Sequence, residues 1–245
     1  MPRFFVPSAQ IKGNLVTLTG DDAHHISRAL RMAAGEHITV VDSASREHDC
    51  VLCDFLADRV TATVVASQEG ATEPPLRITL YQALPKGDKL DFVIQKSVEC
   101  GVAAIYPFES ERCVVRVKPE AEEKKRERRA RIAVEAAKQS ERGILPEVGR
   151  TLSFPDMLEA AAKADLALFC FEGEGTVPIG QILQGRRDVR EIAVIVGSEG
   201  GFSLAEAEKA REQGLLPTGL GKRILRTETA PLFALSCISC LFELT

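Results

Sequence analysis

The stretch VIVGSEGGFS, residues 194–203, is the part of the sequence that most directly indicates the fold. It continues an apolar run from Ile192, which is typical of a strand buried on both faces of a parallel sheet. Three glycines then fall within five residues, and the segment SLAE, 203–206, matches the capping box that begins a helix. A strand, a glycine turn and a helix in this order indicate an α/β domain with a mostly parallel sheet.

The glycine turn also predicts a ligand site. In parallel α/β sheets, ligands bind beyond the carboxyl ends of the strands. Glycine lets a ligand approach the backbone closely, and the start of the following helix favours an anionic group. The alternative is a turn with a purely structural role, which needs glycine for the same conformational reason. The spacing matches neither a GxGxxG fingerprint nor a P-loop.

A second candidate segment is GLGKRILRTETA, residues 219–230, between a short predicted strand and an apolar helix. It places three basic residues, one glutamate and two threonines around the apolar pair Ile224 and Leu225. Two large apolar side chains in a loop would either anchor that loop or line a pocket for a flat ring.

The rest of the chain divides at a polar linker with a proline pair, QEGATEPP, residues 68–75. Before it, five short strands and one helix over 21–31 predict a small β-barrel domain, residues 1–70. After it, strands and helices alternate in an α/β domain, residues 74–245. The elements predicted in this second domain are at 78–83, 88–100, 104–108, 120–142, 165–171, 191–197, 203–213, 215–220 and 231–244.

The composition excludes several classes of protein. The chain has 245 residues, of which 45% are hydrophobic and 27% charged, and its net charge is only −4, so disorder is not expected. No apolar run approaches the ~18 residues of a membrane-spanning helix, and the first residues do not resemble a secretory signal. Seven scattered cysteines suit a reducing cytosol, and neither the two CxxC spacings nor the adjacent His24 and His25 predict a metal site.

The charge is distributed unevenly along the chain. Residues 112–142 contain eleven basic and six acidic side chains, although the protein as a whole is acidic. This stretch could contact RNA phosphates locally, or it could be an ordinary solvated helix face.

The two glycine-containing segments resemble the signature loops of the bacterial 16S ribosomal RNA uridine N3-methyltransferases, a family of the SPOUT superfamily. The resemblance extends to RFFV (3–6), HHISRALR (24–31), KGDK (86–89) and EAAKQS (135–140). It implies a PUA-like RNA-binding β-barrel followed by a SPOUT methyltransferase domain, whose C-terminal part forms a trefoil knot around S-adenosylmethionine. Two departures are Ser198, where the family's loop usually has proline, and Arg131, in a helix where the family often has an aromatic residue.

The resemblance implies roles for particular residues. The S-adenosylmethionine pocket would be formed by Gly197, Gly200, Gly201, Leu220, Gly221, Arg223, Ile224 and Leu225. Contacts with 16S rRNA of the small subunit would come from Arg3, Arg28, Arg31, Lys86, Arg128 and Arg129. The family also implies a cytoplasmic protein that needs no metal and no membrane. It implies a homodimer as well, which the all-round apolar helix at 231–244 independently favours.

Methylation at N3 of uridine requires removal of the N3 proton, because the neutral nitrogen is a poor nucleophile. Glu199 or Glu228 would take the proton, and Arg226 would stabilise the negative charge that develops on the uracil oxygens. Glu199 could instead bind free amides at the start of a helix.

Two other functions fit the same sequence. One is a non-catalytic RNA-binding protein with this architecture, which would not bind S-adenosylmethionine. The other is an enzyme of small nucleotides, which leaves the barrel and the basic stretch unexplained.

Overall fold

The computed structural model describes residues 1–244. The chain forms two compact units, which are described separately. The first contains residues 1–73 and 137–145, and the second contains residues 74–136 and the described residues from 146 onward.

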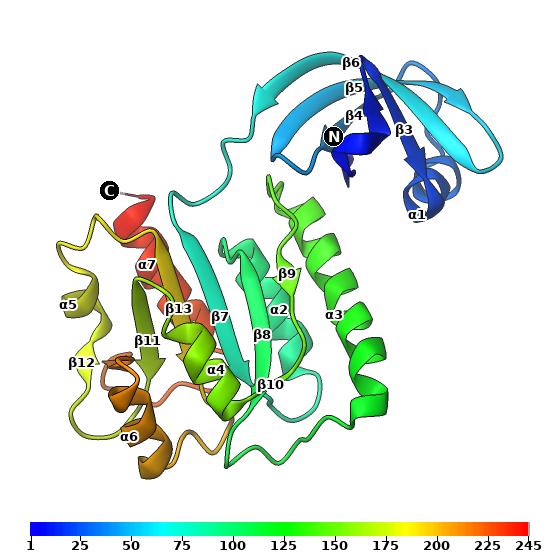
Figure 1. Ribbon diagram of the computed structural model, residues 1–245. Coiled ribbons are helices and arrows are strands. Elements are labelled where there is room, and N and C mark those ends of the chain that lie inside the picture. Colours follow the sequence, from blue (N-terminus) through cyan, green and yellow to red (C-terminus); the bar gives the residue numbers. More distant parts are fainter. Residues whose placement is uncertain (245) are drawn as a thin grey trace. The chain divides into compact units, whose positions relative to one another are not determined.

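The first unit is built on one curled six-stranded sheet (Figure 1). Its strand order is β1-β4-β5-β6-β3-β2, and every pairing is antiparallel except β1 with β4. The edge strands β1 and β2 have three and two residues and do not pair with each other within the described chain, so the predicted barrel is a half-barrel. The strands are β1 Arg3–Phe5, β2 Ile11–Lys12, β3 Leu15–Thr19, β4 His37–Val41, β5 Arg46–Phe55 and β6 Arg59–Glu69.

The concave face of this sheet holds the core of the unit. Alternating residues of the strands are buried there, as the period of a half-buried strand requires. The short helix α1, Gly20–His24, and the π-helical turn His25–Ala29 add Ala23 and Ile26 to the same core. The sequence predicts a single helix over 21–31, but the helical residues end at Ala29 and Arg31 has a positive φ of 53°.

Residues 137–145 belong to the first unit, although their place after the linker predicts that they lie in the second domain. Ion pairs explain this assignment. Lys138 Nζ lies 3.1 Å from Asp22 Oδ1, and Arg142 Nη2 lies 2.6 Å from Glu73 Oε2. Arg3 also donates a hydrogen bond to the Arg142 carbonyl.

The second unit is an α/β domain with helices on both faces of one sheet (Figure 1). All the strand pairings found in this sheet are parallel, as predicted. The order is β10-β8-β7-β13-β11-β14-β12, with β9 also on β8. The strands are β7 Arg77–Ala83, β8 Ala104–Glu109, β9 Glu147–Val148, β10 Leu152–Ser153, β11 Leu166–Cys170, β12 Val177–Pro178, β13 Glu191–Val196 and β14 Leu216–Gly219.

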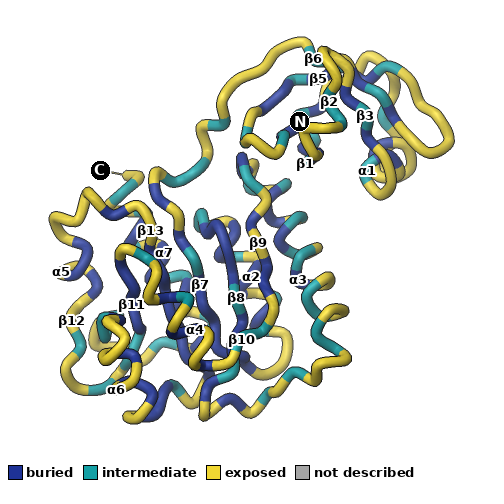
Figure 2. Tube along the Cα trace, viewed as in Figure 1, coloured by how far each residue is buried: buried dark blue, intermediate teal, exposed yellow. Residues whose placement is uncertain are grey.

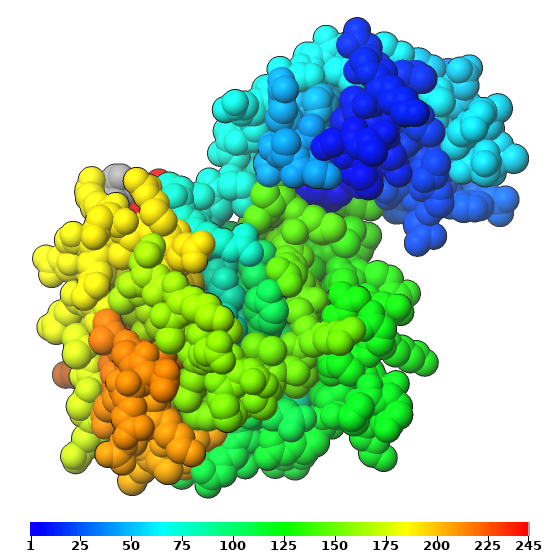
Figure 3. Space-filling model, in the orientation of Figure 1, coloured from blue at the N-terminus to red at the C-terminus, as the bar shows by residue number. Residues whose placement is uncertain are grey.

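The helices of this unit cover a sheet whose central strands are buried along most of their length (Figure 2). Helix α7 contacts both β13 and α2, whereas α6 contacts β14 and α4 contacts β8. One side of the basic helix α3 lies at the surface (Figure 3, green), while Arg129 and Ala133 are buried. The helices are α2 Lys89–Glu99, α3 Pro119–Gln139, α4 Phe154–Ala161, α5 Ile179–Leu183, α6 Leu204–Glu212 and α7 Ala230–Phe242.

Candidate active site

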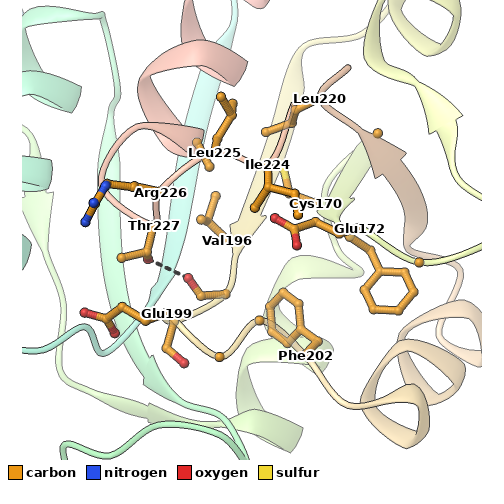
Figure 4. A pocket seen from close by; sticks show the side chains of 18 of the residues that line it. Cys170, Glu172, Val196, Glu199, Phe202, Leu220, Ile224, Leu225, Arg226 and Thr227 are labelled. Atoms are coloured by element: carbon orange, nitrogen blue, oxygen red, sulfur yellow. Dashed lines mark hydrogen bonds between the residues drawn. The ribbon is translucent and has the colours of Figure 1, made fainter. Parts of the chain in front are cut away.

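A pocket of about 710 Å³ lies at the carboxyl ends of three neighbouring parallel strands, β13, β11 and β14 (Figure 4). Each strand passes directly into a lining segment. The segments are Cys170–Gly173 after β11, Val196–Phe202 after β13 and Gly219–Glu228 after β14. The pocket therefore has the position that ligands occupy in parallel α/β sheets.

The glycine loop after β13 has a backbone that requires glycine at two positions. Gly201 has a φ of +62°, and a residue with a side chain would be strained in this backbone conformation. A Cβ on Gly200 would lie 3.0 Å from the Arg112 Cβ, and the Arg112 guanidinium donates to the Gly200 carbonyl. Phe202 then anchors the loop, because its ring packs 4.2 Å from that of Phe169.

The loop after β14 is tied to the glycine loop by Thr227. Its hydroxyl donates a 2.7 Å hydrogen bond to the Gly197 carbonyl (Figure 4). The fully buried Gln82, at the end of β7, donates from Nε2 to the Thr227 hydroxyl and to the same carbonyl, at 3.0 and 3.3 Å. These bonds fix the two loops against each other.

The apolar pair of the second loop lines the pocket. Ile224 is 82% exposed and so does not anchor the loop in a core, and Leu225 is half-buried. Together with Leu220 they provide an apolar wall for a planar group.

Two carboxylates and a lysine form a charged cluster at the pocket. Lys89 Nζ lies 2.9 Å from Glu199 Oε1 and 3.5 Å from Glu228 Oε2. The Lys86 amide also donates to Glu199 Oε1. Burial raises the pKa of Glu199, but the hydrogen bonds from Lys89 and from backbone amides outweigh burial and leave this pKa below its ordinary value. The hydrogen bond to Glu199 in turn raises the pKa of Lys89, so both groups stay ionised at neutral pH.

The structure brings all the predicted cofactor and catalytic residues to this one pocket. Gly197, Gly200, Gly201, Leu220, Gly221, Arg223, Ile224, Leu225, Glu199, Arg226 and Glu228 all line it. The sequence analysis included Lys89 and Thr227 in notable segments without giving either a role, and it missed Gln82, the pocket role of Arg112 and the segment after β11. The position of Cys170 at the end of a buried strand was the one available signal for that last segment.

The capping box predicted at residues 203–206 is present at the start of α6, and it uses two of the amides there. The Ser203 amide donates to Glu206 Oε2, and the Glu206 amide donates to the Ser203 hydroxyl.

The residues predicted to contact RNA have different surroundings. Arg3 is buried and donates to Glu47 Oε1 at 2.7 Å, and Arg129 is buried against Thr151, so neither guanidinium reaches the surface. Their roles are therefore structural. Arg128 is exposed and paired with Asp91. Arg28, Arg31 and Lys86 are exposed.

Neither a metal site nor a membrane span is found in residues 1–244. No group of three or more potential metal ligands occurs among these residues. None of their helices combines the length and apolarity needed to cross a membrane.

Desolvation raises the pKa of the Cys50 thiol to about 12, as expected for a cysteine inside a core.

The fold and the pocket define a class, the RNA methyltransferases. A family model described as an RNA methyltransferase domain matches residues 72–239, and a model of an RNA methyltransferase PUA domain matches residues 18–53. The chain is 37% identical to the ribosomal RNA small subunit methyltransferase E of Bacillus subtilis over 93% of its own length and 91% of the relative's. It belongs to the ribosomal RNA small subunit methyltransferase E family.

Solved structures agree with this assignment. The chain is 34% identical to a ribosomal RNA small subunit methyltransferase E from Neisseria gonorrhoeae that is bound to S-adenosyl methionine, with a TM-score of 0.85 over 99% of this chain and 98% of the other. A putative methyltransferase from Legionella pneumophila, in complex with the same cofactor, is 32% identical, with a TM-score of 0.82 over 97% and 96% of the two chains.

Proposed function

We propose that this chain transfers a methyl group from S-adenosylmethionine to N3 of a uridine in 16S rRNA of the small ribosomal subunit. The observation that carries the proposal is the pocket at the ends of β11, β13 and β14, which combines glycine backbone, an apolar wall and carboxylate side chains in a chain of this family. Relatives of the same fold hold S-adenosylmethionine in their structures.

The residues of the pocket suit this cofactor. Its volume is within the range of small-molecule sites, roughly 300–1,000 Å³. Leu220, Ile224 and Leu225 would contact the adenine ring, and Gly200 and Gly201 leave backbone accessible beside it. The buried Ser198 hydroxyl has no hydrogen-bond partner among residues 1–244 and would supply one polar group for a ligand.

The cofactor supplies an electrophilic methyl group, and the chain has to prepare the nucleophile. Holding the base in line with that methyl makes the transfer effectively intramolecular. A pocket carboxylate, Glu199 or Glu228, would accept the N3 proton, and Arg226 would stabilise charge on the uracil oxygens. Figure 4 shows Glu199 and Arg226 on one side of the pocket, away from Leu220 and Phe202.

The rRNA would be held by exposed basic side chains of both units. In the half-barrel these are Arg28 and Arg31, and in the second unit they are Lys86 and the stripe of α3 formed by Lys124, Arg128 and Arg131. The three stripe residues follow at i, i+4 and i+7, so they share one helical face. In this proposal the stripe takes the RNA-contact role predicted for Arg129, whose side chain is buried.

We also propose a homodimer that works in the cytoplasm, where its rRNA substrate is made. Helix α7 supports a dimer because Leu232, Phe233 and Cys240 are half-buried or exposed on its outward side, where the exposed Ser236 is the polar residue among them. The trefoil knot implied by the family stays a prediction of the same proposal.

The proposal is tested by incubating the purified protein with methyl-labelled S-adenosylmethionine and small subunits from a strain that lacks the enzyme. Label in 3-methyluridine at one position of 16S rRNA is expected. Calorimetric titration with S-adenosylmethionine distinguishes the proposed enzyme from a non-catalytic RNA-binding protein. The latter would neither bind the cofactor nor transfer label to the RNA.

A further inference from the structure

The two carboxylates in the charged cluster of the pocket lie at different distances from Lys89. Lys89 reaches both from the first turn of α2, and its side chain is 31% exposed. The Lys89 ammonium is 2.9 Å from Glu199 but 3.5 Å from Glu228. One lysine therefore holds one carboxylate closely and the other loosely.

The remaining contacts increase this difference. Glu199 Oε1 accepts a second hydrogen bond, 3.0 Å long, from the Lys86 amide. Among residues 1–244, the buried Glu228 Oε2 has the Lys89 ammonium as its ionic partner, at 3.5 Å, and no hydrogen bond of ordinary geometry. A buried carboxylate oxygen with unused acceptor capacity can accept a donor from a ligand. Glu199 already has two close donors, whereas Glu228 has only the more distant ammonium.

We propose that Lys89 is a positioning residue that fixes Glu199 as a permanent anion and leaves Glu228 as the general base of the reaction. This inference rests on the proposed function. It assigns separate tasks to two residues that the sequence could not distinguish.

The N3–H bond of the uracil breaks, and its proton passes to a carboxylate oxygen of Glu228. The N3 electron pair forms the new bond to the methyl carbon, and the bond between that carbon and sulfur breaks, with its electron pair staying on sulfur. The Lys89 ammonium keeps its proton throughout, so it compensates the negative charge of Glu199 in every state.

Other charged groups around the pocket act on Glu228 as well. Lys89 pairs with it from α2, and Glu199 and Arg226 line the same pocket. The pocket around Glu228 therefore contains cations as well as a second carboxylate. The full set of charged side chains that line the pocket is Lys89, Arg112, Glu172, Glu199, Lys222, Arg223, Arg226 and Glu228.

The test compares E228Q, E199Q and K89M, with K96M as a matched control. Lys96 lies on the same helix and pairs with Glu99, but it does not line the pocket. In single-turnover methyl transfer, E228Q is expected to be at least about 100-fold slower, which is the usual contribution of a general base. Its rate should recover as the pH rises, because uracil then loses its N3 proton to solvent. E199Q should show no such recovery, and E228D should retain more activity than E228Q.

A measurement without substrate tests the role of Lys89. The titration of the Glu199 carboxyl, followed by carbon-13 NMR in the cofactor-free protein, should move to higher pH in K89M and stay unchanged in K96M. Calorimetry should show S-adenosylmethionine binding to E228Q within about threefold of the parent, and thermal melting should show that each variant is folded.

Three results would overturn the inference: parent-like transfer by E228Q, a slow E228Q that high pH does not rescue, or a Glu199 titration that K89M leaves in place. A parent protein that methylates no small-subunit RNA would instead refute the proposed function. In that case the NMR titration still decides whether Lys89 holds Glu199.

Discussion

Gly201 is the residue at which the pocket backbone is most easily tested. Its φ of +62° strains any L side chain by roughly 1–2 kcal/mol, and a β-branched one by more. G201V is therefore expected to weaken S-adenosylmethionine binding more than tenfold in calorimetry while the melting temperature changes little. G180V is the control, since Gly180 has an ordinary φ, open space around it and no place in the pocket. Equal affinities for G201V and the parent would refute the assignment of this loop.

Arg3 is predicted from the sequence to contact RNA, but the structure places it in the interior, where its effect on stability can be tested. It forms a buried ion pair with Glu47, and the hydrogen bond from Arg3 is the main reason that the pKa of Glu47 lies below its ordinary value. R3A leaves this carboxylate unpaired, so the free energy of unfolding should fall by about 3–5 kcal/mol. R28A, at an exposed position, should have almost no effect.

The acid dependence of this pair has a defined sign. The lowered pKa means that Glu47 stabilises the folded state fully above its ordinary pKa of about 4.3 and stops doing so as the pH falls through the lowered value. The difference in stability between the parent and R3A, measured by denaturant unfolding, should therefore shrink in acid. A difference that is constant down to pH 2 would contradict the pairing.

At the scale of single residues, the sequence predicted the two pocket segments that follow β13 and β14 but not how their residues interact. Glycine and apolar positions after strands could be read directly, because parallel strands end at a common edge. Lys89 and Gln82 could not, because their contacts with Glu199 and Thr227 join segments more than a hundred residues apart. Arg128 and Arg129 are neighbours of the same type, and only the rotation of the helix separates an exposed arginine from a buried one.

Among the elements, helix α3 carries the most specific prediction. Replacing Arg128 and Arg131 by alanine should weaken binding to small-subunit RNA. It should also reduce the slope of log affinity against log salt by about one unit for each phosphate that the variant no longer neutralises. K163A is the control, since Lys163 is exposed on another part of this unit. Filter binding at several salt concentrations gives the slope, and an unchanged slope would make α3 an ordinary solvated helix face.

The long, strongly patterned elements were predictable and the short ones were not. Strand β13 and helix α6 follow from an apolar run and a capping box, which are local signals. Strands β9 and β10 have two residues each and exist only because they pair with β8. That segment 137–145 groups with the first unit could not be predicted for a similar reason, because its position depends on ion pairs with distant residues.

For the molecule as a whole, we expect two copies to associate through the outward side of helix α7. Within the apolar helix that the sequence predicts at 231–244, Leu235 is completely buried in its own unit, so a charged replacement there would destabilise the fold and could not test the interface alone. Phe242 is half-buried near the end of the helix and remains a suitable probe. F242E should shift the mass measured by light scattering from dimer to monomer at micromolar concentration, whereas V65E, at an exposed position on β6, should not. A parent protein of monomer mass would refute the dimer.

The proposed methylation of N3 at one uridine in 16S rRNA is decided by mass spectrometry of the nucleosides from that RNA. Small-subunit RNA is compared from the parent strain, from a deletion strain, and from the deletion strain carrying either the parent chain or E228Q. We expect one 3-methyluridine to disappear on deletion, to return with the parent chain and to stay absent with E228Q. An unchanged amount of 3-methyluridine in the deletion strain would contradict the proposed function.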